Sequence, residues 1–207
     1  MTGQLLHRQS DVEQLSSLIL RNARLIDGTG AVWDRADIHV HDGRISEISS
    51  ALALDDRART VDLAGKTILP GLINCHTHVC GDRLDSPPGA TPTQMVAEYA
   101  VRGARWLEDA LQHGVTAIRD VGGKAHVDLA LRRLIENGQL AGPRMRVSGR
   151  LICMTGGHGW FNQDGIEADG PQEVRKAARS QLKAGVDLIK VMATGGVLTA
   201  GTQPGAP

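Results

Sequence analysis

Two stretches of this chain share a pattern in which a helical segment ends at glycine and a hydrophobic strand begins at once. They cover residues 114–119 and 185–190. Glycine is common just after a helix C-terminus, and the apolar residues that follow are typical of a buried strand. Repeated helix and strand units of this kind build parallel sheets with crossover helices. The second part of the chain is therefore predicted to be an α/β domain.

The predicted elements after Pro70 alternate in type. Helices are expected at 91–113, 124–137 and 171–185, the first opening with a capping box at Thr91. Strands are expected at 71–79, 115–120, 144–148 and 186–192. A closed (β/α)₈ barrel needs eight such units and roughly 250 residues. We therefore expect half of a TIM barrel, about four β-α units, and interpret the sequence as a fragment.

Before Pro70 the pattern is one of short strands. They are expected at 18–26, 36–41, 44–48 and 67–69, with a hairpin signal at Asp42-Gly43. His39 and His41 are interpreted as the solvated face of a half-buried strand. The predicted organisation is a polar N-terminal extension at 1–16, a small β region at 17–70 and a barrel half at 71–207.

Composition excludes several partner classes. Lysine plus arginine and aspartate plus glutamate number 23 each, so no overall field favours nucleic acid or membrane surfaces. Neither a secretion signal nor a membrane span is visible. Three cysteines leave one unpaired under any disulfide scheme, which favours a reducing, cytoplasmic setting.

The strand at 71–79 carries His76-Thr77-His78. Alternation along a strand directs both imidazoles to one face, where they can bind the same metal ion. Neutral imidazole suits zinc and similar divalent ions. The alternative is that the two histidines lie at a strand end with their hydrogen bonds satisfied and bind no metal. We favour metal binding, because two co-facial histidines in so apolar a run are costly without a shared role.

Lys190 interrupts the apolar strand at 186–192. Burial of an ammonium group is costly, and it favours a neutral amine, which can take up carbon dioxide and become a carbamate that bridges two cations. The alternative is a lysine that extends to solvent or pairs with Asp187. Beside the histidine pair, we favour the metal role.

Two further residues lie just after predicted strands, where barrel enzymes place their chemistry. His158 lies in a glycine-rich loop, so it is a candidate substrate contact, and a plain loop role is equally open. Asp120 follows the second strand, where a helix-capping role is the preferred interpretation.

Together, the motifs at 70–78, 116–123, 156–159 and 189–197 resemble those of the amidohydrolase superfamily. The resemblance extends from Ser17 to the end of the chain. It is greatest for the branch that holds imidazolonepropionase-related proteins, metal-dependent prolidases (Xaa-Pro or Xaa-Lys/Arg dipeptidases) and ochratoxinase-like amidases.

The resemblance implies a (β/α)₈ barrel beside a small β-sandwich built from both chain ends, with 17–70 as its N-terminal part. It implies that His76 and His78 bind one metal, that carboxylated Lys190 bridges two Zn²⁺ ions, and that His158 lies near the substrate carbonyl. The family also needs two histidines from strands five and six and a catalytic aspartate from strand eight. These residues lie outside this chain, so no catalytic residue is assigned within it.

The expected function is hydrolysis of an amide or peptide bond in a small molecule, of the dipeptide or N-acyl amino acid type, by a metal-bridging hydroxide. With an incomplete ligand set, the 207 residues are expected to bind metal weakly and to be inactive. One alternative is a single-zinc, imidazolonepropionase-like hydrolase of cyclic amides. Another is a non-catalytic half-barrel that serves binding or assembly and covers its open sheet edges by pairing with another chain, as in a homo-oligomer.

Overall fold

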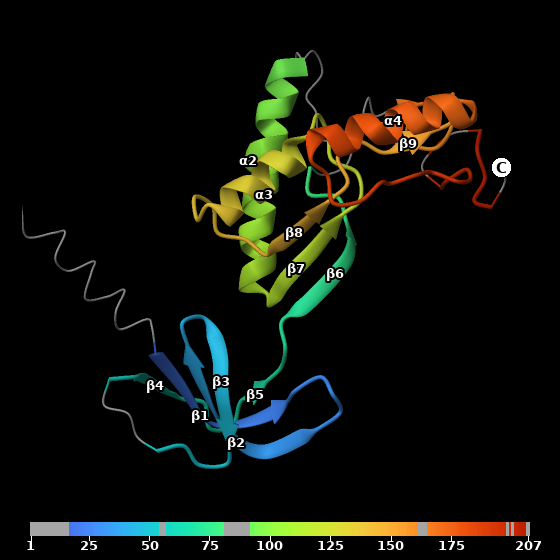
Figure 1. The fold of residues 1–207 in the computed structure, drawn as a ribbon. Helices are drawn as coiled ribbons and strands as arrows, with labels where there is room; N and C mark the ends of the chain where they lie inside the picture. Colours follow the sequence, from blue (N-terminus) through green and yellow to red (C-terminus); the bar gives the residue numbers. More distant parts are fainter. Residues whose placement is uncertain are drawn as a thin grey trace, which may run out of the picture. The chain divides into compact units, whose positions relative to one another are not determined.

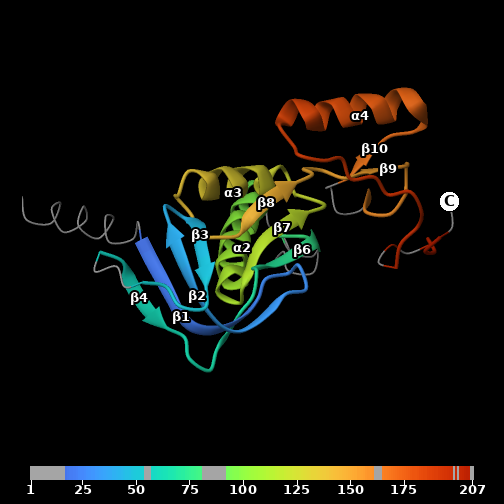
Figure 2. The same cartoon turned by 60° about the horizontal axis from the view of Figure 1, so that its bottom comes forward.

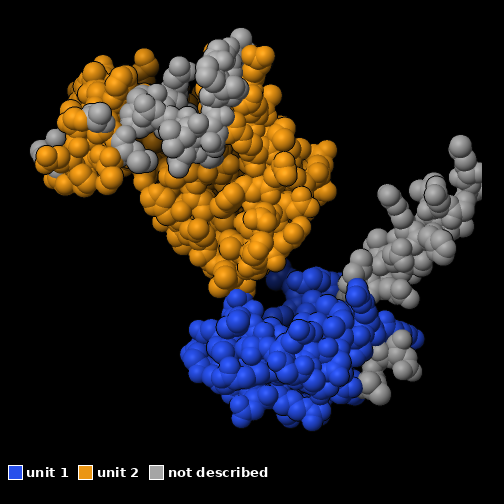
Figure 3. All heavy atoms as spheres, turned by 180° about the vertical axis from the view of Figure 1, so that it is seen from behind, with its two compact units in different colours: residues 1–70 blue, residues 71–207 orange. Residues whose placement is uncertain are grey.

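The chain divides into two compact units, residues 1–70 and 71–207 (Figure 3). The computed structural model describes residues 17–53, 57–80, 92–160, 165–197, 199 and 201–205. The predicted extension at 1–16 and the capping residue Thr91 lie outside the described residues.

The first unit is built on a five-stranded sheet (Figure 1). Strand β1 pairs antiparallel with β2 and parallel with β4 and β5, and β3 pairs antiparallel with β2. Four of these strands match predicted ones, whereas β4 was not predicted because its polar residues show little apolar alternation. The strands are β1 (Ser17–Ile26), β2 (Val32–His41), β3 (Arg44–Ser49), β4 (Arg59–Asp62) and β5 (Thr67–Ile68).

A buried carboxylate joins three parts of this unit. Asp37 is fully buried and accepts hydrogen bonds from the backbone N–H groups of Asn22 and Leu52 and from the guanidinium of Arg21. Burial alone would raise the pKa of Asp37, but these donors hold it below its ordinary value. Beside it, Ala36 and Ile38 contribute to the apolar core of the sheet.

The second unit contains a parallel sheet in the order β6-β7-β8. Helices α2 and α3 cover one face of this sheet, and α4 packs on the short parallel pair β9 and β10 (Figures 1 and 2). The strands are β6 (Leu72–Thr77), β7 (Val115–Asp120), β8 (Arg144–Val147), β9 (Ile152–Cys153) and β10 (Ile166–Glu167). The helices are α2 (Pro92–Gln112), α3 (Val127–Glu136) and α4 (Gly170–Ala184).

Small and branched residues explain how the helices pack. Leu107 of α2 and Leu131 of α3 lie buried in one core with Ile118 of β7. Gly103 lets α2 approach this core closely, since a Cβ atom there would lie 2.7 Å from Leu131 Cδ1. Helix α3 begins three residues later than predicted because His126 and the residue before it adopt left-handed backbone angles.

The prediction of a regular strand at 186–192 is wrong. This segment makes one parallel bridge, between Val191 and Ile152, and Asp187 N–H donates to the carbonyl of Val147. The segment with which it would pair is interrupted between Val147 and Ile152, where Gly149 has a φ of 61°. A continuous ladder requires an uninterrupted partner strand, so the left-handed residue breaks the pairing.

No helix in the described ranges is both long and apolar enough to cross a membrane.

Candidate functional site

Strand β6 places the two histidines of the His-x-His motif next to each other. His76 lies within the strand, His78 follows its last residue, and their ring centroids are 5.3 Å apart at an interplanar angle of 72°. Thr77 between them is buried, and its hydroxyl donates to the carbonyl oxygen of Arg119. The threonine therefore anchors the strand while both imidazoles are exposed, as alternation predicts.

Asp120 fixes the turn that carries His78, and its predicted role as a helix cap is wrong. Its fully buried carboxylate accepts a hydrogen bond from Val79 N–H at 2.6 Å and another from Gly122 N–H at 3.1 Å. Burial raises the pKa of Asp120, while these two donors act to lower it. Helix α3 begins only at Val127, beyond the turn that Asp120 stabilises.

Gly122 leaves space for the His78 ring. A Cβ atom on this glycine would lie 3.1 Å from His78 Nδ1, so a larger residue would press on the imidazole. His78 is thus positioned in two ways. Asp120 binds the backbone N–H of the next residue, and Gly122 leaves room for the imidazole ring.

Lys190 lies within electrostatic reach of the histidine pair. Partial desolvation lowers the pKa of His76, and the positive charge of Lys190 lowers it further. Both effects favour the neutral imidazole, which is the form that binds metal. Asp187 does not take Lys190 as its partner, because among the described ion pairs its carboxylate binds Arg132 and Arg146.

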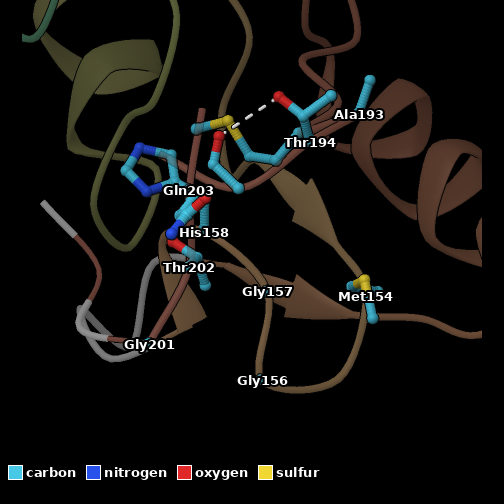
Figure 4. A pocket seen from close by; sticks show the side chains of 11 residues that line it. Met154, Gly156, Gly157, His158, Ala193, Thr194, Gly201, Thr202 and Gln203 are labelled. Atoms are coloured by element: carbon cyan, nitrogen blue, oxygen red, sulfur yellow. Dashed lines mark hydrogen bonds between the residues drawn. The ribbon is translucent and has the colours of Figure 1, made fainter. Parts of the chain in front are cut away.

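His158 lines a cavity of about 400 Å³ between the loop after β9 and the segment after Lys190 (Figure 4). Its Nδ1 atom is 2.7 Å from the hydroxyl of Thr199, and its ring lies against Gly196, where a Cβ atom would be 2.3 Å from Nδ1. The other cavity residues are mostly small or polar: Met154, Gly156, Gly157, Met192, Ala193, Thr194, Gly195, Gly201, Thr202 and Gln203.

The described residues therefore offer two histidines and a lysine, but no group of three His, Cys, Asp or Glu side chains that could hold a metal ion. This set fits part of a zinc site, because zinc takes about four ligands in all. Residues 67–207 match the model of the amidohydrolase family. This chain belongs to the amidohydrolase family.

The relatives of this amidohydrolase include an ochratoxinase and two peptidases. Ochratoxinase from Aspergillus niger is 27% identical over 94% of this chain and 46% of its own length. The crystal structure of that enzyme matches with a TM-score of 0.75, covering 91% of this chain and 49% of the relative.

Two peptidase structures are similar as well. A prolidase complexed with N-methylphosphonate-L-proline is 29% identical, with a TM-score of 0.80 over 92% of this chain and 50% of its own. A Xaa-Pro dipeptidase with bound methionine is 30% identical, with a TM-score of 0.78 over 89% of this chain and 48% of its own.

This amidohydrolase chain therefore spans about half the length of the relatives it matches. The predicted fold class, the N-terminal half of an α/β TIM barrel, is confirmed by these neighbours. The predicted membership in the superfamily that includes prolidases and ochratoxinase is confirmed too.

Asp128, a buried carboxyl beside the site of this amidohydrolase, is not among the residues predicted from the sequence. Asp128 lies in the first turn of α3, and its Oδ2 atom accepts a hydrogen bond from Gly149 N–H at 2.8 Å. Burial, together with the charge of Asp120, raises its pKa to about 6. A polar residue next to Val127 on the buried face of an amphipathic helix was the available signal.

Replacement of Asp128 by asparagine is expected to change how stability depends on pH. A raised pKa means that the carboxyl contributes stability below its unfolded value of 3.8, and that this contribution is lost as pH rises through about 6. The shift corresponds to roughly 3 kcal/mol. The free energy of unfolding of Asp128→Asn, measured by urea denaturation, should therefore depend less on pH between these values. At pH 7 it should be higher than that of wild type.

The exposed Asp109→Asn on α2 is the control for this measurement. It should keep the wild-type slope between these pH values. A wild-type slope in Asp128→Asn itself would contradict the assignment of a buried, high-pKa carboxyl.

Proposed function

We propose that this chain is part of a metal-dependent enzyme that hydrolyses an amide or peptide bond in a small molecule of the dipeptide or N-acyl amino acid type. The observation that carries the proposal is the pair of His76 and His78 rings at the carboxyl end of β6, where partial desolvation and the nearby, unmodified amine of Lys190 lower the pKa of His76. Family membership supports hydrolysis at carbon-nitrogen bonds, and the prolidase and ochratoxinase relatives support the substrate class.

Each site residue has a distinct part in this proposal. His76 and His78 would hold one zinc ion, and Lys190, as a carbamate, would supply a negative charge shared by two ions. Bound zinc would provide a Lewis acid and lower the pKa of water. His158 would hold the substrate carbonyl from the cavity side, because it lines the cavity beside the segment that follows Lys190.

The same ligand count supports a second part of the proposal. Two histidines and one lysine carbamate cannot satisfy two zinc ions of about four ligands each. We therefore propose that these 207 residues bind zinc weakly and do not catalyse hydrolysis by themselves. The three free cysteines support a reducing, cytoplasmic setting.

Zinc titration with and without bicarbonate tests the part assigned to Lys190. Bicarbonate should strengthen zinc binding to the wild-type chain, and native mass spectrometry should detect one added carbon dioxide. Lys190→Ala should lose both effects, because the carbamate forms on its amine. Lys183→Ala, at the exposed end of α4, should keep them.

The stoichiometry distinguishes the two enzyme classes. In a protein that has the complete ligand set, a single bound zinc and no carbamate on Lys190 would contradict the two-metal site and favour a hydrolase of cyclic amides.

Hydrolysis is tested in a chimera that joins this chain to the second half of the prolidase it matches. We expect zinc-dependent cleavage of Xaa-Pro dipeptides or N-acyl amino acids, lost in His76→Ala. Circular dichroism and zinc content establish whether the chimera is folded and loaded. A folded, zinc-loaded chimera that cleaves no member of either substrate class would contradict the proposed function, and cleavage by the 207-residue chain alone would contradict its inactivity.

A further inference from the structure

The cavity contains a buried hydroxyl that faces His158. Thr199 is only 3% exposed, and its Oγ1 atom is 2.7 Å from His158 Nδ1. The backbone N–H of Gly159 also donates to this oxygen, at 3.4 Å. One hydroxyl thus joins the imidazole to the backbone of the loop that carries it.

The direction of these bonds determines where the proton of His158 lies. A backbone N–H can only donate, so Thr199 Oγ1 is the acceptor for Gly159, and its own hydrogen needs an acceptor. Within the described part of the chain, His158 Nδ1 is the acceptor that this hydroxyl contacts. The opposite arrangement, with Nδ1 donating, would leave a buried hydroxyl hydrogen unpaired, which costs about 1–3 kcal/mol.

Packing holds the ring in this arrangement. Gly196 lies directly against the imidazole, and a Cβ atom on it would be 2.3 Å from Nδ1 and 2.4 Å from Cε1. The ring edge that bears Nδ1 is therefore covered by Thr199 and Gly196. Nε2 is the ring nitrogen left to meet a ligand in the cavity that His158 lines.

We propose that Thr199 is a positioning residue that fixes neutral His158 as a hydrogen-bond donor through Nε2. Resting on the proposed function, this gives His158 the part of polarising the substrate carbonyl oxygen rather than that of accepting a proton. An imidazole whose Nδ1 accepts from a hydroxyl presents N–H, not a lone pair, on its other side.

The test is the ¹⁵N spectrum of the imidazole rings in the 207-residue chain, without metal or substrate. At a pH at which the ring is neutral, wild-type His158 should have a protonated Nε2 and an unprotonated Nδ1. In Thr199→Val, the shifts of the two nitrogens should move toward each other, because the hydroxyl no longer selects one tautomer. Thr199→Ser should restore the wild-type pair of shifts.

Thr194→Val is the matched control. Thr194 lines the same cavity, but its hydroxyl donates to the carbonyl of Gly195 and not to the ring. It should leave the His158 shifts unchanged.

A neutral wild-type ring that is protonated at Nδ1 would overturn the inference even if Thr199→Val fails to fold. Wild-type shifts in a folded Thr199→Val would overturn it too. Because neither zinc nor hydrolysis enters the measurement, its outcome is independent of whether the proposed function holds.

Discussion

Alanine at His76 or His78 is expected to lower the affinity of this chain for zinc by about 100-fold or more. The two rings are adjacent on one strand, and partial desolvation, together with the positive charge of unmodified Lys190, lowers the pKa of His76 and so favours its neutral, metal-binding form. With so few ligands in the chain, loss of either imidazole removes a large part of the site. Competition with a fluorescent zinc chelator measures the effect, and circular dichroism verifies that each variant is folded.

The chain offers a matched control with the same spacing. His39 and His41 lie on β2 with ring centroids 6.1 Å apart, but His39 is hydrogen-bonded to Ser17. The double variant His39→Ala/His41→Ala should bind zinc as wild type does. If its zinc affinity falls as far as that of His76→Ala, zinc binds exposed histidines in general and not the β6 site in particular. The assignment of His76 and His78 as ligands would then be wrong.

The features that could be predicted from sequence are local ones. Alternation along one strand was enough to place His76 and His78 side by side, because it depends only on neighbouring residues. The alternating pattern after Pro70 likewise predicted three helices and three strands of the second unit, since each is encoded in a continuous apolar periodicity.

The failures share a physical cause, which is dependence on distant contacts. The segment at 186–192 has the composition of a strand, but its pairing depends on a partner that is broken at Gly149. Asp120 resembles a capping residue until its partner Val79, 41 positions away, is known. Thr199 meets His158 across 41 positions as well, and no pattern in the sequence relates them.

Gly123→Ala is expected to destabilise the second unit by about 2–3 kcal/mol, as overpacking of a filled core does. A Cβ atom at this position would lie 2.1 Å from both Cγ and Oδ1 of Asp128, far inside van der Waals contact. The carboxyl cannot withdraw without breaking its hydrogen bond from Gly149 N–H. Urea denaturation at pH 7 should show a lower midpoint with an unchanged slope.

A double-mutant cycle separates this clash from a general intolerance of alanine in the turn. The three atoms nearest to the added methyl group all belong to Asp128, so Asp128→Ala should remove most of the penalty of Gly123→Ala. We expect a coupling free energy of at least about 1 kcal/mol between the two substitutions. Additive effects would mean that the glycine is required by the backbone itself. Strong coupling would mean that the Asp128 carboxyl, which binds the turn after β8, leaves room only for glycine in the turn after β7. The two turns beside His78 would then depend on each other.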